Sequence, residues 1–136
     1  MNTQSDILVI DDDKDLVETI RVVLESRGFR VRTAYNGSEG RAQIKEKIPD
    51  LILLDVMMST DTEGFDLASK LKQSEKYRAV PIVMLTSFPS GMAEKGPERF
   101  QHILGEEWPV SEFLEKPVNP DDLIAIIEEV LAEKKT

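Results

Sequence analysis

The chain has 136 residues, 40% of them hydrophobic, with 17 basic and 26 acidic side chains and a formal net charge of −9. This length and apolar content support one compact domain with a real core, and the acidic balance argues against a nucleic-acid backbone or an anionic membrane surface as the main partner. The absence of cysteine excludes disulfides, thiolate metal sites and cysteine nucleophiles, and is compatible with a reducing cytoplasm.

The first half of the chain alternates strand patterns with helical ones. An apolar run over 7–10 ends at three consecutive acids, and apolar residues then recur at helical spacing up to a stop at Gly28. Residues 29–35 alternate loosely between apolar and polar side chains, which predicts an edge strand, and a helix over 38–46 follows. Residues 51–55, Leu-Ile-Leu-Leu-Asp, form a continuous apolar run that predicts a strand covered on both faces.

The second half repeats this alternation with one irregular interruption. A loop that continues to Gly64 precedes a helix, and an apolar run over 82–85 predicts the fourth strand. Prolines and glycines break up residues 88–110, and a short apolar pair at 113–114 predicts the fifth strand. Asn119-Pro120 then starts the closing helix, because asparagine caps helix N-termini and proline suits the first helical position.

Five strand-then-helix units in succession predict the fold class. This order indicates an α/β fold with a doubly wound, five-stranded parallel sheet, right-handed crossovers and helices on both faces. The carboxyl ends of parallel strands lie at one edge of the sheet, where such folds bind ligands. Four of the five predicted strands end in side chains that can do chemistry: Asp11 and Asp12, Asp55, Thr86 and Ser87, and Lys116.

These strand-end residues combine a candidate metal site with a candidate oxyanion site. Carboxylates gathered in one crevice repel one another unless a cation lies among them, and Mg²⁺ prefers hard oxygen ligands, so Asp11, Asp12 and Asp55 suit this ion. The hydroxyl of Thr86 and the ammonium of Lys116 match the needs of a tetrahedral phosphoryl group. Asp55 is then the obvious nucleophile for an acyl-phosphate reaction. Taken alone, an acidic run before a helix more often caps the helix than binds a metal. The prediction of a metal site therefore depends on Asp55 lying at the same edge of the sheet.

The motifs at these strand ends, taken together, resemble the receiver domain of two-component response regulators. They are Ile-Asp-Asp-Asp, Leu-Leu-Asp, Leu-Thr-Ser and Glu-Lys-Pro, in chain order, followed by the helix start Asn-Pro-Asp-Asp-Leu. The resemblance spans residues 6–134 and implies a single receiver domain of flavodoxin-like fold with strand order 2-1-3-4-5. A polar lead at 1–5 and a tail at 135–136 would flank it.

The resemblance implies a phosphoacceptor chemistry for the site. Asp55 would accept a phosphoryl group from a phosphohistidine, and Thr86 and Lys116 would bind the phosphoryl oxygens. Ser87, in the position where the family often has a small residue, would leave access to the acceptor.

A metal, a switch and a cis bond are implied in the same way. The Mg²⁺ ligands would be Asp11, Asp12, Asp55 and the backbone carbonyl of Met57. Thr86 and Phe113 would be the switch residues, and the bond before Pro117 would be cis, which costs little before proline.

The sequence departs from the family pattern at three places. Ser59 stands where the family usually has proline, and Gly64 lies nine residues after Asp55, which lengthens that loop by one residue. Thr86 and Lys116 are 30 residues apart, more than is usual, so the intervening segment should depart from the family's fourth helix. The aromatic switch position holds phenylalanine, where tyrosine is frequent.

The resemblance also implies the partners. These are a sensor histidine kinase or a histidine phosphotransfer protein as phosphodonor and an unidentified downstream protein as target, with no nucleic acid, no membrane and a cytoplasmic location. The chain would be a monomer or a phosphorylation-dependent dimer. Because no residues follow the closing helix for an output domain, we expect a stand-alone switch with intrinsic phosphorylation and dephosphorylation chemistry, and not an enzyme.

Two other interpretations remain open at this point. Asp11-Asp12-Asp13 after an apolar strand also resembles the Asp-x-Asp motif of haloacid-dehalogenase-like phosphohydrolases, in which Asp11 would be the nucleophile. Against this, Asp15 stands where threonine or valine is usual, and no clear late pair of acids follows. The third interpretation is a receiver-like interaction module that is never phosphorylated, which the altered loop after Asp55 allows.

Overall fold

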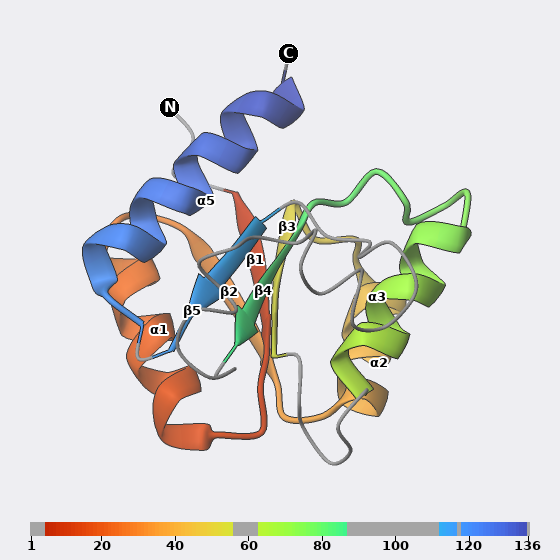
Figure 1. Ribbon diagram of the computed structural model, residues 1–136, viewed down its shortest axis with the longest axis horizontal. Coiled ribbons are helices and arrows are strands. Elements are labelled where there is room, and N and C mark those ends of the chain that lie inside the picture. Colours follow the sequence, from red (N-terminus) through yellow and green to blue (C-terminus); the bar gives the residue numbers. More distant parts are fainter. Residues whose placement is uncertain (1–4, 56–62, 87–111, 117, 136) are drawn as a thin grey trace.

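The structure is a computed structural model and describes residues 5–55, 63–86, 112–116 and 118–135 (Figure 1). The strands of the described part are β1 (Asp6–Ile10), β2 (Arg30–Ala34), β3 (Leu51–Asp55), β4 (Ile82–Thr86) and β5 (Glu112–Glu115). Its helices are α1 (Lys14–Ser26), α2 (Gly37–Glu46), α3 (Glu63–Gln73) and α5 (Pro120–Lys135).

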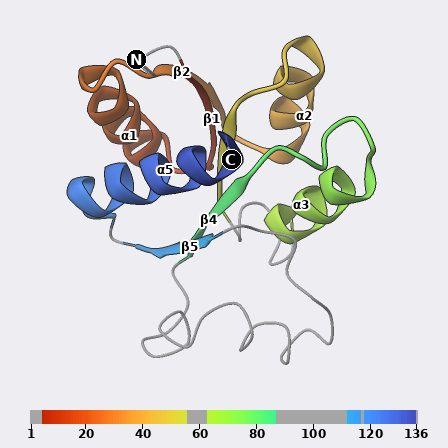
Figure 2. The same cartoon turned by 90° about the horizontal axis from the view of Figure 1, so that it is seen from above.

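The strands form one parallel sheet in the order β2-β1-β3-β4-β5. Helices α1 and α5 cover one face of the sheet, and α2 and α3 cover the other (Figure 1, Figure 2). The predicted α/β class, the doubly wound parallel sheet and the order 2-1-3-4-5 are therefore confirmed. The prediction that the second strand lies at an edge is confirmed as well.

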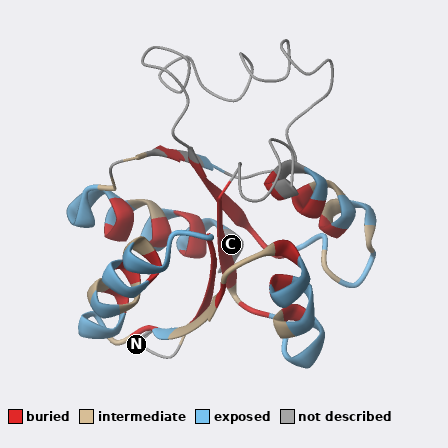
Figure 3. Ribbon diagram, turned by 90° about the horizontal axis from the view of Figure 1, so that it is seen from below, coloured by how far each residue is buried: buried red, intermediate tan, exposed pale blue. Residues whose placement is uncertain are grey.

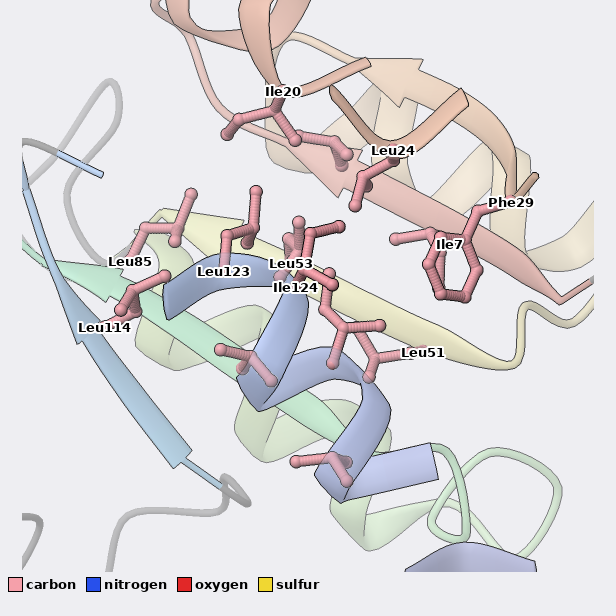
Figure 4. Close-up of a cluster of buried hydrophobic side chains, with 14 of the residues drawn as sticks. Ile7, Ile20, Leu24, Phe29, Leu51, Leu53, Leu85, Leu114, Leu123 and Ile124 are labelled. Carbon is pink, nitrogen blue, oxygen red and sulfur yellow. The ribbon is translucent and has the colours of Figure 1, made fainter. Parts of the chain in front are cut away.

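The continuous apolar runs of the central strands have a direct structural cause. Successive strand residues point to opposite faces, so a strand with helices on both sides must be apolar throughout. In β1 the side chains of Ile7 and Val9 join the core under α1 and α5, and those of Leu8 and Ile10 join the core under α2 and α3. Buried residues accordingly line both faces of the sheet in Figure 3, and Figure 4 shows the first core around Leu53.

The helix ends are set by capping residues. Asp13 begins α1, and its side chain accepts a hydrogen bond from the backbone N–H of Leu16 at 3.1 Å. The helix stops before Gly28, whose φ of 90° is the left-handed conformation that favours glycine. Asn36 caps α2, and Asn119 caps α5 by accepting two first-turn N–H groups at 2.9 and 3.2 Å. Each of these signals was readable in the sequence.

Gly40 lets helix α2 approach strand β1 closely. A Cβ atom on Gly40 would lie 2.6 Å from Cδ1 of Ile10, a separation that packed atoms do not tolerate. The glycine lowers the helical propensity of α2, but it is the residue that allows the helix to pack on the sheet.

The amino end of β1 is held by an ionic network around a buried acid. Asp6 is 4% exposed and forms an ion pair with Arg32 of β2, with Nη2 of Arg32 3.0 Å from Oδ2 of Asp6. The same guanidinium donates hydrogen bonds to the backbone carbonyls of Gln43 and Lys47, both at 2.8 Å, where α2 ends. Arg32 therefore connects β1, β2 and the end of α2 near the amino ends of the strands, away from the strand carboxyl ends.

Some boundaries differ from the sequence prediction. Helix α3 begins at Glu63, so Gly64 belongs to a helix and not to the preceding loop, and α5 includes Lys135 of the predicted tail. The irregular segment 88–110 lies outside the described residues. Within the part of the chain that the structure describes, no helix combines the length and the apolar character that crossing a bilayer requires.

Candidate functional site

Strands β1 and β3 bring two of the predicted site residues together. The two strands are parallel neighbours, and Ile10 pairs with Leu54. Asp11 directly follows β1 and Asp55 is the last residue of β3, so the register places the two acids side by side at the carboxyl ends of the strands. The convergence predicted from the apolar runs is therefore realised in the structure.

Asp11, Asp12 and Asp55 form a compact acidic cluster. One carboxylate oxygen from each residue lies within 4.8 Å of the others. Asp11 is fully buried and Asp55 is 3% exposed, whereas Asp12 is exposed to solvent. Burying two carboxylates is costly unless positive charge and hydrogen bonds compensate them, so the cluster requires a counterion.

Backbone contacts fix the orientation of Asp11. Its Oδ1 atom accepts a hydrogen bond from the backbone N–H of Asp13 at 2.9 Å, and its own N–H donates to the carbonyl of Ala34 at 3.1 Å. The Oδ2 atom faces Lys116 and has no hydrogen-bond partner elsewhere in the described residues. One oxygen of Asp11 is thus committed to the backbone, while the other is directed into the site.

Lys116 supplies the positive charge between the two buried acids. Its Nζ atom lies 2.9 Å from Oδ2 of Asp11 and 3.5 Å from Oδ1 of Asp55. Burial by itself lowers the pKa of the Lys116 ammonium, but the attraction of Asp11, followed by that of Asp55, outweighs burial and raises the pKa above its usual value. The lysine therefore stays charged at neutral pH and serves as the counterion of the cluster.

The donor set fits a hard divalent cation. All three groups are carboxylates, the ligands that Mg²⁺ prefers, and this ion keeps several waters, so two or three protein oxygens suffice. The exposure of Asp12 leaves one side of the cluster open to solvent. A cation entering the cluster would share Asp11 and Asp55 with Lys116, since both acids already face that ammonium.

The remaining predicted site residues are described only in part. Thr86 ends β4 beside Glu115, and Phe113 of β5 pairs with Met84, so their backbones lie at the places the sequence predicts. The described atoms do not include the side chains of Thr86 and Phe113. The other predicted positions, Met57, Ser87 and Pro117, lie outside the described residues.

Two contacts of the site were not foreseen in the sequence. Lys116 was predicted as a phosphoryl ligand, and its role as the counterion of buried Asp11 was missed, although two acids at neighbouring buried strand ends signal the need for a cation. Asp13 was recognised as part of an acidic run that can cap a helix, and the hydrogen bond from its backbone N–H to Asp11 was missed. It caps α1 through its side chain and holds Asp11 through its backbone N–H.

Comparison with known proteins establishes the family. The family described as the response regulator receiver domain matches residues 7–128. The chain belongs to this family.

Similar proteins and structures agree with this assignment. The receiver domain is 38% identical over 125 residues to the phosphate regulon transcriptional regulatory protein PhoB of Pseudomonas aeruginosa, covering 92% of this chain and 51% of that protein. It therefore spans about half the length of the curated relatives it matches. A two-component response regulator structure from Clostridium difficile aligns with a TM-score of 0.80 and 27% identity, covering 98% of this chain and all of that one.

A second structure supports the same fold. A CheY-like response regulator receiver domain protein from Methanospirillum hungatei aligns with a TM-score of 0.79 and 29% identity over 97% of both chains. The resemblance identified from the strand-end motifs is thereby confirmed: this is a receiver domain of the two-component response regulators, and its acidic cluster fits the binding of Mg²⁺.

Proposed function

We propose that this receiver domain is a phosphoacceptor switch in which Asp55 takes a phosphoryl group from the phosphohistidine of a sensor histidine kinase or a histidine phosphotransfer protein. The observation that carries the proposal is the position of Asp55. Its carboxylate stands at the carboxyl end of the central strand β3, beside two further acids and 3.5 Å from the Lys116 ammonium.

The transfer requires one nucleophilic oxygen and a path for the leaving group. An Oδ atom of Asp55 attacks phosphorus, and an O–P bond forms as the N–P bond of the phosphohistidine breaks. The electron pair of that bond leaves with the imidazole, which holds or takes up a proton from solvent. Lys116, already within 3.5 Å of Asp55, is positioned to move toward the phosphoryl oxygens, because its three N–H donors form charge-assisted hydrogen bonds with such oxygens.

The metal belongs to the same proposal. Asp11, Asp12, Asp55 and the backbone carbonyl of Met57 would hold Mg²⁺, which supplies neutralising charge when bound. The contribution of the chain is to fix Asp11, whose Oδ1 is anchored by the N–H of Asp13, and to keep its second oxygen directed at the site.

Further assignments rest on the family and on the position of each residue. Thr86, the last residue of β4, would bind phosphoryl oxygens, and Ser87, the next residue in the sequence, would leave access to them. Thr86 with Phe113 would couple the site to a signalling surface. The bond before Pro117 would be cis. The domain would comprise residues 6–134 and act in the cytoplasm on a protein target, as a monomer or as a dimer formed on phosphorylation.

The buried state of Asp11 argues for this chemistry over phosphohydrolase chemistry. In a haloacid-dehalogenase-like enzyme Asp11 would be the nucleophile. Here it is fully buried, one of its oxygens accepts a backbone hydrogen bond and the other faces the Lys116 ammonium at 2.9 Å. A nucleophile needs an oxygen that can reach its substrate, and both oxygens of Asp11 are already engaged.

Intact mass spectrometry tests the proposal. Wild type, Asp55→Asn and the control Asp15→Asn, an exposed acid in the first turn of α1, are incubated with a small phosphodonor in Mg²⁺ and in chelator. We expect one phosphoryl adduct on wild type and on the control, dependent on Mg²⁺, and none on Asp55→Asn. A folded wild type without an adduct under any condition would contradict the proposal, as would multiple turnover of phosphate esters that is lost only in Asp11→Asn.

A further inference from the structure

Helices α2 and α3 lie on the face of the sheet away from α1 and α5 (Figure 2). Residues of both helices line a groove. The groove consists of two adjoining hollows with volumes of about 500 Å³ and about 170 Å³, and both are lined by Arg41, Lys45 and Leu67. Among the described residues, its lining shares no member with the acidic cluster. We call it the α2–α3 groove.

Small side chains on α2 create the space. Gly37, Ser38 and Ala42 line the larger hollow, and Ser38 and Ala42, four residues apart, lie on one side of the helix. Gly40 draws the same helix onto β1, since any larger residue would collide with Ile10. The helix therefore presents little bulk toward α3 and leaves a depression along its length.

The groove has an apolar floor. Leu67, Leu71 and Ile44 line it and belong to the core under α2 and α3, against which the half-buried ring of Tyr77 also packs. Leu67, Leu71 and Ile44 are themselves buried, so the apolar surface that the groove offers to an occupant is that of the exposed Ala42 and the half-buried Tyr77. This surface favours an occupant with at least one apolar side chain of its own.

The rim of the groove is cationic, whereas the chain as a whole is acidic. Within the part of the chain that the structure describes, the charged side chains that line the two hollows are Arg41, Lys45 and Lys70, with no acid beside them. The chain as a whole carries 26 acidic and 17 basic side chains, so three cations without an acid are a local reversal of its charge. All three are exposed, and none has an ion-pair partner among the described residues.

We propose that the α2–α3 groove is a docking site for an acidic segment of a partner protein, an amphipathic helix that lays apolar side chains on the floor and carboxylates against the rim. Charge complementarity selects this occupant, because carboxylates would meet three unpaired cations. The net charge of −9 opposes a long-range approach, but at physiological ionic strength charges are screened beyond ~8 Å, so the groove acts at short range. The proposal is independent of phosphoryl transfer at Asp55.

Binding of a designed probe tests the proposal. The probe is a fluorescein-labelled helical peptide of glutamates with leucines at every third and fourth position, measured by anisotropy at physiological salt and mapped by amide chemical shifts. Two matched peptides replace all glutamates by glutamine or all leucines by serine. We expect saturable binding of the probe, with shifts confined to α2 and α3, and loss of binding with either matched peptide.

Two charge-reversal variants of the protein localise the effect. Lys45→Glu changes the rim in the last turn of α2, and the control Arg27→Glu makes the same change of charge at the exposed end of α1. We expect Lys45→Glu to raise the dissociation constant of the probe about fivefold. Arg27→Glu should change it much less, because of these two residues only Lys45 lines the groove.

Other outcomes would overturn the proposal. Equal weakening by Lys45→Glu and Arg27→Glu would mean that only overall charge matters, and no binding of the probe would mean that the groove takes no acidic helix. Shifts in α2 and α3 that depend on protein concentration without peptide, with dimers in sedimentation velocity, would identify a second copy of the chain as the occupant. Each of these results differs from a failure to phosphorylate Asp55, which none of the measurements requires.

Discussion

The ammonium of Lys116 lies 2.9 Å from a carboxylate oxygen of Asp11, a side chain with no exposure to solvent. The pair joins the end of β1 to the residue that follows β5, across the width of the site. Removing the counterion of a buried acid strongly destabilises the folded protein, so this contact links the stability of the domain to the charge in its site.

Replacement of Lys116 by methionine should lower stability in the absence of metal. The variant removes the ammonium that pairs with two buried carboxylates, and we expect a loss of about 1–3 kcal/mol in the free energy of unfolding in chelator. Urea denaturation measures the loss. The control Lys47→Met removes a more exposed cation, 3.8 Å from Asp6, and should cost much less. Equal stability of Lys116→Met and wild type would show that the Lys116 contact is dispensable.

Mg²⁺ should raise the melting temperature of wild type, and Asp11→Asn should abolish this response. Asparagine keeps the acceptor for the Asp13 N–H but removes a charge from the cluster, and a ligand stabilises a protein only through the native state that binds it. Differential scanning calorimetry with Mg²⁺ and with chelator measures the shift. Asp15→Asn, which alters an acid outside the cluster, should keep the full response, and a response retained in Asp11→Asn would contradict the predicted ligand set.

Gly40→Ala should destabilise the domain although alanine favours helices. The added Cβ collides with Cδ1 of Ile10, and overpacking of this kind costs ~1–3 kcal/mol, which offsets the gain of ~1 kcal/mol in helix propensity. Ile10→Val removes that Cδ1 atom, so Gly40→Ala should cost less in the Ile10→Val background. A double-mutant cycle of unfolding free energies measures the coupling, and a coupling of zero would mean that α2 shifts to avoid the contact.

Arg32→Met should lower stability without changing the chemistry of the site. It removes the ion pair of buried Asp6 and two hydrogen bonds to the end of α2, and we expect a loss of about 3 kcal/mol. Phosphorylation of Asp55 under conditions where the variant is folded should match wild type, because Asp6 and Asp55 stand at opposite ends of their strands. The exposed Arg27→Met should cost less than ~0.5 kcal/mol.

Lys72 predicts a pH dependence at the alkaline end. Burial lowers the pKa of its ammonium, which donates hydrogen bonds to the carbonyls of Arg78 and Val80 at 3.0 Å. Between the folded and the unfolded pKa the unfolded chain binds more protons, so stability rises with pH up to the usual value of 10.5. The difference in unfolding free energy between wild type and Lys72→Met should therefore grow over that window and stay constant near neutral pH. A difference that shrinks as the pH rises over that window would contradict the prediction.

The fold was predictable because its determinants are local. The apolar runs end where the strands end, and Asp13, Gly28, Asn36 and Asn119 mark helix boundaries by their own hydrogen bonding or backbone conformation. The convergence of Asp11 with Asp55 followed from the rule that parallel strands end at one edge. These predictions needed no knowledge of any contact between distant side chains.

The misses involve contacts between residues distant in sequence. Gly40 only lowers the helical propensity of α2 until Ile10 is placed against it. The one local miss is the helix start at Glu63, where the following Gly64 indicated a loop. That Lys116 is the counterion of Asp11 depends on strands β1 and β5, which are not neighbours in the sheet. Propensity and periodicity carry no information on such pairs.

Strand β1 carries a buried acid at its amino end and another just beyond its carboxyl end, and the two have different counterions. Asp6 is neutralised by Arg32, whose guanidinium is also tied to backbone carbonyls of α2, so its counterion is built into the frame. Asp11 is neutralised by Lys116, whose ammonium lies at the end of a flexible four-carbon stem. The acid at the amino end of β1 thus has a counterion held by backbone hydrogen bonds, and the acid at its carboxyl end has a counterion on a flexible side chain. The charge in the site can therefore change without breaking the contacts that hold the other end of the strand.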